Sequence, residues 1–192
     1  MFIRIWYSLL YVWILKTILG KIRRKYKYLR LNFQDAHEFS GQVPKYLDEP
    51  LYNFLNNLYN KKLLDDTAII IASDHGNSYF RYLYYHILRS DDAYVEITYG
   101  TLFIIVPNYK DEKNNKLLNN IKLNQQTYCS PYDIHDTIIH IGFGDKSDIK
   151  SNIYSNRGNS LLSEFNYLDR NCKTYDGVLE SREFCLCEKK YE

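Results

Sequence analysis

Apolar and polar residues along this chain follow two different periods, and each period predicts its own kind of element. Residues 67–72 (TAIIIA) and 101–106 (TLFIIV) are short, mostly apolar runs rich in β-branched side chains, which predicts two buried strands. Residues 28–33 (YLRLNF) alternate apolar and polar positions, which predicts a third strand. The three runs together predict the strands of one sheet.

Helical periodicity appears between and after these runs. Asp48 is placed to cap a helix from about Glu49 to Leu63, whose apolar positions form one stripe: Leu51, Phe54, Leu55, Leu58 and Tyr59. Residues 110–123 are mostly polar, which predicts a helix at the surface. A short helix is also expected around residues 160–165.

The segment from Ser130 carries the clearest helix start in the chain. Ser130 is placed to cap, Pro131 suits the first helical position, and Asp133 falls in the first turn, where a negative charge is favourable. We expect this helix to run to about Ile141 and to stop at Gly142.

Strands that alternate with helices predict an α/β fold: three layers, α/β/α, with a mostly parallel sheet between helices. The expected organisation is an apolar-then-basic helix over residues 1–27, the α/β domain over residues 28–145 and a cysteine-containing tail over residues 146–192.

Residues 5–15 (IWYSLLYVWIL) are apolar nearly all round but are shorter than the roughly 20 residues that cross a bilayer. They suit either a buried helix that continues to about Lys27 or the apolar region of a signal peptide. The strong positive charge follows the run, at residues 21–27, whereas it precedes the run in a signal peptide. This order favours the buried helix.

The formal net charge of +2 among 192 residues gives no reason to expect a nucleic-acid partner. Three of the four cysteines, Cys172, Cys185 and Cys187, lie in the tail. No second cysteine pair gives the spacing of a zinc site. We therefore expect Cys172 to form a disulfide with Cys185 or Cys187 in an oxidising compartment.

The strongest candidate chemistry lies where the central strand ends, in the sequence TAIIIASDHG. Binding sites of open α/β sheets lie beyond the carboxyl ends of strands, and Asp74 and His75 follow the strand directly. A carboxylate beside an imidazole suits a zinc or manganese ion. His37 follows the strand predicted at residues 28–33 and is a further candidate. The ordinary alternative is a set of strand-end side chains that hydrogen-bond to loops.

An isoleucine-rich strand ending in Ser-Asp-His-Gly resembles the alkaline phosphatase superfamily, which includes sulfatases and phosphoglycerate mutases. The order of motifs over about residues 20–187 is similar to the C-terminal half of the sulfatase-like family known as domain of unknown function 229. That order is His37, Ser73–Gly76, Glu96 before an apolar strand, SPYDIHDTIIHIG, GNSLLSEF, Arg170 and the cysteine-rich tail.

The resemblance implies an alkaline-phosphatase-like fold, truncated on its N-terminal side, and metal-dependent hydrolysis of phosphate or sulfate esters. Asp74 and His75 would bind the ion that activates the nucleophile, and His37 would bind a second ion or a substrate oxygen. The ion would be zinc, manganese or calcium. The partner would be a phosphate- or sulfate-ester substrate, and the location would be extracellular or membrane-tethered, with a tether upstream.

Several residues depart from the family pattern. Residues 77–94 are tyrosine-rich, and Asp35 and His37 are closer together than the corresponding pair in superfamily phosphatases. Neither the first metal-binding aspartate nor the nucleophile is found, so we expect this chain alone to be catalytically inactive. The alternative is a non-catalytic remnant with a binding or structural role. The remaining candidates are Asp35 and His86 as weaker ligands, Glu96 orienting a ligand, His135 tying helix to sheet, and His140 as a packed or surface residue.

Overall fold

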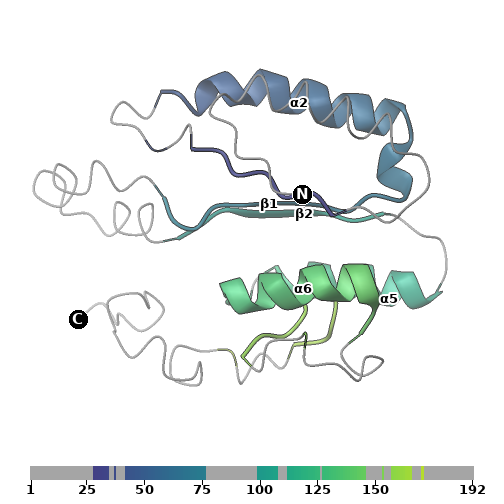
Figure 1. Ribbon diagram of the computed structural model, residues 1–192. Helices are drawn as coiled ribbons and strands as arrows, with labels where there is room; N and C mark the ends of the chain where they lie inside the picture. Colours follow the sequence, from purple (N-terminus) through teal and green to yellow (C-terminus); the bar gives the residue numbers. More distant parts are fainter. Residues whose placement is uncertain are drawn as a thin grey trace, which may run out of the picture. The chain divides into compact units, whose positions relative to one another are not determined.

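The computed structural model describes residues 28–34, 37, 42–76, 99–107, 112–125, 127–145, 153, 157–165 and 170 (Figure 1). Its elements, in chain order, are α2 (Lys45–Asn60), the 3-10 helix η1 (Leu63–Asp65), β1 (Ile69–Ala72), β2 (Leu102–Ile105), α5 (Glu112–Asn124) and α6 (Pro131–Phe143). The helix predicted in residues 1–27, the residues Asp35, His86 and Glu96, and the three tail cysteines lie outside the described residues.

The chain divides into two compact units. The first comprises Met1–Leu64 and Ile70–Phe103, and the second comprises Asp65–Ile69 and Ile104–Glu192. Among the described residues, no helix is long and apolar enough to cross a membrane.

The strands predicted at residues 67–72 and 101–106 form as β1 and β2 and pair with each other. Their residues are half-buried or exposed rather than buried as predicted. Directly beyond β1, the backbone N–H of Ser73 donates to the carbonyl oxygen of Thr101 at 2.9 Å, just before β2 begins. The end of β1 therefore lies beside the start of β2, and the pair is antiparallel. Two strands are too few to define a larger sheet, so the mostly parallel three-layer arrangement stays a prediction.

Residues 28–34 have no regular secondary structure, although the alternating pattern predicts a strand there. The alternation of burial is nevertheless present, because Leu29 and Leu31 are half-buried while Tyr28, Arg30 and Asn32 are exposed. An alternation of apolar and polar residues indicates which side chains face the protein interior. This alternation does not indicate whether a neighbouring strand is close enough to form hydrogen bonds.

Helix α2 begins at Lys45, about one turn before the predicted cap at Asp48. Pro44 stands at the cap position without a side-chain hydrogen bond. The first turn is instead closed by backbone bonds, including Lys45 N–H to Gln42 O at 3.1 Å. Asp48 lies inside the first turn, where its charge still suits the helix N-terminus. The expected apolar stripe is present in part: Phe54 and Leu58 are buried, whereas Tyr59 is 70% exposed. The helix ends at Asn60, and Leu63, its predicted end, lies in η1.

Helix α6 begins as predicted. Ser130 caps it, Pro131 takes the first position, and Ser130 and Asp133 bond to each other's backbone N–H in a capping box. The helix passes through Gly142 and ends at Phe143, and the following Gly144 is its C-cap, with a φ of +104° that suits glycine.

The segment of residues 160–165 in the second unit forms a turn rather than the predicted short helix. It lies along α6 (yellow-green in Figure 1) and buries Leu161, Leu162 and Phe165. Helix α5 was expected to be a surface helix, yet it buries Asn120 and Asn124. Both asparagines contact the turn, which explains why polar side chains occupy the buried face of this helix.

Candidate functional site

Asp74 and His75 form a bend directly beyond β1. The Asp74 side chain is 90% exposed and that of His75 is 47% exposed. The backbone N–H of His75 donates to Asp74 Oδ1 at 3.0 Å, which fixes the carboxylate beside the histidine. The strand end thus presents both side chains to solvent, as a ligand pair requires.

The imidazole of His75 has a defined proton position. Its Nδ1 lies 2.6 Å from the carbonyl oxygen of Gly76. Because a carbonyl oxygen only accepts, Nδ1 carries the proton, and in the neutral ring the lone pair is on Nε2. Nε2 lies 3.7 Å from Asp74 Oδ2. In the neutral ring, the nitrogen that carries the lone pair therefore lies beside a carboxylate oxygen.

This spacing is close to that of two ligands on one ion. Ligand atoms about 2.0–2.2 Å from a zinc ion with tetrahedral geometry are roughly 3.4 Å apart. A small rotation of the exposed Asp74 side chain covers the difference from 3.7 Å. An N–H donated to a backbone carbonyl is also the usual support of a metal-binding histidine. The pair fits a divalent ion, but it supplies only two ligands.

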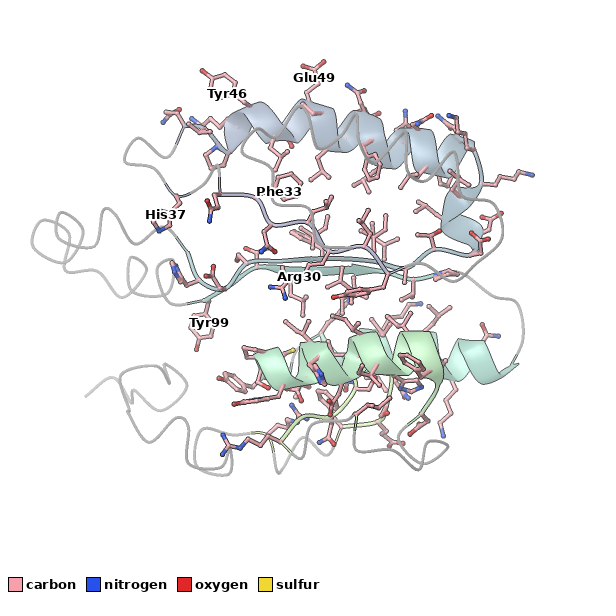
Figure 2. All side chains as sticks on the ribbon, viewed as in Figure 1. Arg30, Phe33, His37, Tyr46, Glu49 and Tyr99 are labelled. Carbon is pink, nitrogen blue, oxygen red and sulfur yellow. The ribbon has the colours of Figure 1, made fainter. Side chains whose placement is uncertain are left out.

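His37 belongs to the same unit as the pair. Its side chain is exposed, and its backbone N–H donates to Gln34 O at 3.0 Å. Figure 2 shows His37 on the side of this unit where β1 ends and β2 begins. Among the residues that the structure describes, no group of three histidine, cysteine, aspartate or glutamate side chains is arranged to hold a metal ion. Joint action of His37 with Asp74 and His75 stays a prediction.

A second polar cluster lies in the second unit, around the fully buried carboxylate of Asp133. Oδ2 accepts from Arg170 Nη1 at 2.7 Å and from the N–H and hydroxyl of Ser130 at 2.8 and 2.9 Å. Oδ1 accepts from Arg170 Nη2 at 3.0 Å and from the N–H of Asn159 at 2.8 Å. Burial by itself raises the pKa of Asp133, but these hydrogen bonds and the positive charge of Arg170 bring it below its usual value.

The cluster continues along α6 through Thr137 and His140. The hydroxyl of Thr137 donates to Asp133 O at 2.6 Å and accepts from the N–H of Leu161 at 2.9 Å. His140 is buried and bonds through Nδ1 to Ser160 Oγ at 3.0 Å, which makes it a packed residue rather than a surface one.

Helix α5 holds the same turn from its own side. Asn120 Nδ2 donates to Leu162 O at 2.8 Å, and Asn124 Nδ2 donates to the carbonyls of Leu161 and Ser163 at 2.9 and 2.8 Å. Every one of these contacts fixes the backbone of the turn. The motifs SPYDIHDTIIHIG and GNSLLSEF, with Arg170, therefore build a scaffold that joins two helices to the turn.

The observed hydrogen bond of His135 is not the predicted contact between helix and sheet. The His135 side chain is 52% exposed, and Nδ1 lies 2.9 Å from Oδ1 of the neighbouring Asp136, whose side chain is fully buried. The observed bond thus joins two adjacent residues of α6.

Comparison with known protein families gives a match. No curated protein and no solved structure matches the chain. A family model described as "Protein of unknown function (DUF229)" matches residues 14–192, nearly the whole chain and all of the described elements. The chain therefore belongs to the DUF229 family.

Proposed function

We propose that Asp74 and His75 bind a divalent metal ion that serves the hydrolysis of phosphate or sulfate esters. The observation that carries the proposal is the bond from His75 Nδ1 to Gly76 O, which leaves the Nε2 lone pair 3.7 Å from Asp74 Oδ2. The reaction class rests on the resemblance of the ordered motifs to the alkaline phosphatase superfamily. The expected fold is the three-layer α/β/α arrangement of that superfamily.

The chain's own residues have distinct parts in this proposal. Asp74 supplies a carboxylate oxygen, His75 supplies Nε2, and Gly76 O holds the imidazole in the tautomer that can ligate through Nε2. His37 is the candidate ligand of a second ion or the candidate contact of a substrate oxygen. A mixed carboxylate and imidazole set suits zinc or manganese better than calcium, which prefers oxygen ligands. When bound, such an ion stabilises the attacking and leaving oxygens of an ester.

The deciding experiment is a calorimetric titration of the full 192-residue chain with Mn²⁺. Manganese is preferred to zinc because the chain has four cysteines, and thiolates favour zinc. We expect Asp74→Ala and His75→Ala each to weaken Mn²⁺ binding at least about tenfold, since each removes one ligand.

His135→Ala is the matched control. His135 and His75 have similar exposure, 52% and 47%, and each lies next to an aspartate in sequence. The aspartate beside His135 is fully buried, whereas Asp74 is exposed. Affinity in His135→Ala should stay within about twofold of wild type. A wild-type chain that binds no Mn²⁺, or binding that all three variants leave unchanged, would favour the non-catalytic remnant.

Hydrolysis is measured in parallel with 4-nitrophenyl phosphate and 4-nitrophenyl sulfate. We expect no turnover above a protein-free control, because covalent catalysis needs an activated nucleophile and none is identified among these residues. Metal-dependent turnover that disappears in Asp74→Ala would show instead that the chain carries a complete active site.

A further inference from the structure

The antiparallel ladder between β1 and β2 changes its pattern at Ser73. In a regular hydrogen-bonded pair, two facing residues exchange both N–H to carbonyl bonds. Ser73 and Thr101 make only one such bond, from Ser73 N–H to Thr101 O at 2.9 Å. The second bond of a regular pair would run from Thr101 N–H to Ser73 O. Here the Thr101 N–H donates instead to the Ser73 hydroxyl, at 2.7 Å. The side chain of Ser73 thus replaces its own carbonyl in the ladder.

Because the hydroxyl takes over this role, the carbonyl of Ser73 can turn out of the ladder and the strand can end at this residue. The carbonyl of Ser73 faces Gly100, where a Cβ atom would overlap the carbonyl oxygen and lie 3.3 Å from the carbonyl carbon. The same Cβ would lie 3.4 Å from Asp74 O. Only a residue without a side chain leaves this space for the backbone, so Gly100 admits the turned carbonyl.

We propose that Ser73 and Gly100 are positioning residues that fix the Asp74–His75 bend and the tautomer of His75. The inference deepens the proposed function and rests on it for its metal-binding consequence. Neither residue supplies a ligand. The hydroxyl of Ser73 holds the start of β2, and Gly100 receives the carbonyl, so the peptide that leads into Asp74 has one orientation.

The arrangement makes a specific prediction for Ser73→Ala. Without the hydroxyl, the Thr101 N–H loses its hydrogen-bond acceptor. In a regular antiparallel ladder, the acceptor for this N–H is the backbone carbonyl of residue 73. Rotation of that carbonyl into the ladder turns the following peptide. The His75 ring then leaves Gly76 O, and Nδ1 loses the bond that fixes its proton.

The test measures the tautomer of His75 by nitrogen NMR in the metal-free chain. It measures the Mn²⁺ affinity by calorimetry. We expect a dominant Nδ1–H tautomer in wild type, its loss in Ser73→Ala and Gly100→Ala, and its recovery in Ser73→Thr, which restores a hydroxyl. Mn²⁺ affinity should fall at least about fivefold in the first two variants and return in the third.

Two controls separate positioning from general damage. Thr67→Ala removes a hydroxyl just before β1, where it contacts only Asp66 Oδ1, at 3.4 Å, among the hydrogen bonds described. Gly142→Ala adds a Cβ that meets no atom within 4 Å beyond the neighbouring backbone of its own helix. Both should keep the wild-type tautomer and affinity.

The outcomes distinguish the positioning role from the metal site. Wild-type His75 in the Nε2–H form, or a tautomer unchanged in both Ser73→Ala and Gly100→Ala, would overturn the inference. If Ser73→Ala does not fold, Gly100→Ala and Ser73→Thr still decide it. A tautomer that responds as expected in a chain that binds no Mn²⁺ would support positioning while removing the proposed function.

Discussion

The carboxylate of Asp133 and the guanidinium of Arg170 form a two-pronged ion pair, at 2.7 and 3.0 Å, across 37 residues of sequence. The Arg170 side chain is 5% exposed, that of Asp133 is fully buried, and the guanidinium lies 3.8 Å from the centre of the Phe165 ring. The planar guanidinium matches a carboxylate with two parallel hydrogen bonds. One carboxylate therefore both caps α6 and anchors Arg170.

Removal of Arg170 should destabilise the protein strongly, because it leaves a buried carboxylate without its counter-charge. We expect Arg170→Ala to lower the free energy of unfolding by about 3–5 kcal/mol, a large share of the roughly 5–15 kcal/mol of a typical domain. Urea unfolding followed by circular dichroism measures the change.

Arg157→Ala is the control, since this exposed arginine also lies over a ring, 5.8 Å from the centre of Tyr132. Its loss should cost about 0.5–1 kcal/mol. Equal effects of the two substitutions would contradict the role given to the buried pair.

Stability should fall in acid through Asp133. Its pKa is lowered in the folded protein, mainly by hydrogen bonds that outweigh the effect of burial. A folded state that binds the proton more weakly than the unfolded chain is stabilised above the unfolded pKa, about 3.9. That contribution is lost as the pH falls through the lower, folded pKa. Unfolding free energies measured from pH 6 to pH 2 should therefore decline more steeply in wild type than in Asp133→Asn, and parallel curves would refute this.

The sequence predicts the start of α6 because all its signals are local: Ser130, Pro131 and Asp133 lie within four positions. It does not predict the partners of Asp133, since Asn159 and Arg170 lie 26 and 37 residues away. Local signals also mislead at α2, where backbone bonds in the turn before Asp48 extend the helix.

The candidate metal site shows the same limit. The adjacency of Asp74 and His75 is visible in the sequence, and so is their place after a strand. The bond that sets the tautomer of His75 joins it to a backbone carbonyl, and the bond that shapes the bend joins Ser73 to Thr101, 28 residues away. Both depend on the folded course of the backbone, which residue types alone do not specify.

Cys129 should resist alkylation in the folded protein. The pKa of its thiol is raised to about 12, mainly by burial and also by the negative charge of Asp133, while the positive charge of Arg170 offsets part of this rise. Since the thiolate is the nucleophile, its fraction at pH 8 is roughly a thousandfold below that of an ordinary cysteine with a pKa of about 8.5. Iodoacetamide at pH 8, followed by peptide mass mapping, should label Cys129 only after urea unfolding.

Fast labelling of Cys129 in the native chain would contradict this environment. Peptide mass mapping without a reducing agent also tests the predicted pairing of Cys172 with Cys185 or Cys187. The pairing would appear as one disulfide-linked peptide.

Two glycines of the second unit should respond to alanine with opposite sign. Gly142 lies exposed within α6, and a Cβ there meets nothing within 4 Å, so Gly142→Ala should stabilise by about 0.5–1 kcal/mol through lower backbone entropy in the unfolded chain. Gly158 is buried against α6. A Cβ there would overlap the carbonyl oxygen of Tyr132 and lie 2.9 Å from Asp136 Oδ2.

Gly158→Ala must therefore push its segment away from α6, and the bond from Asn159 to Asp133 begins at the next residue. We expect a loss of about 1–3 kcal/mol, as for overpacking of a close contact. Urea unfolding of both variants measures the two changes against one wild-type curve. A neutral Gly158→Ala would mean that the segment can move from the helix at no cost, and it would remove the tight packing on which the role of Asp133 as an anchor depends.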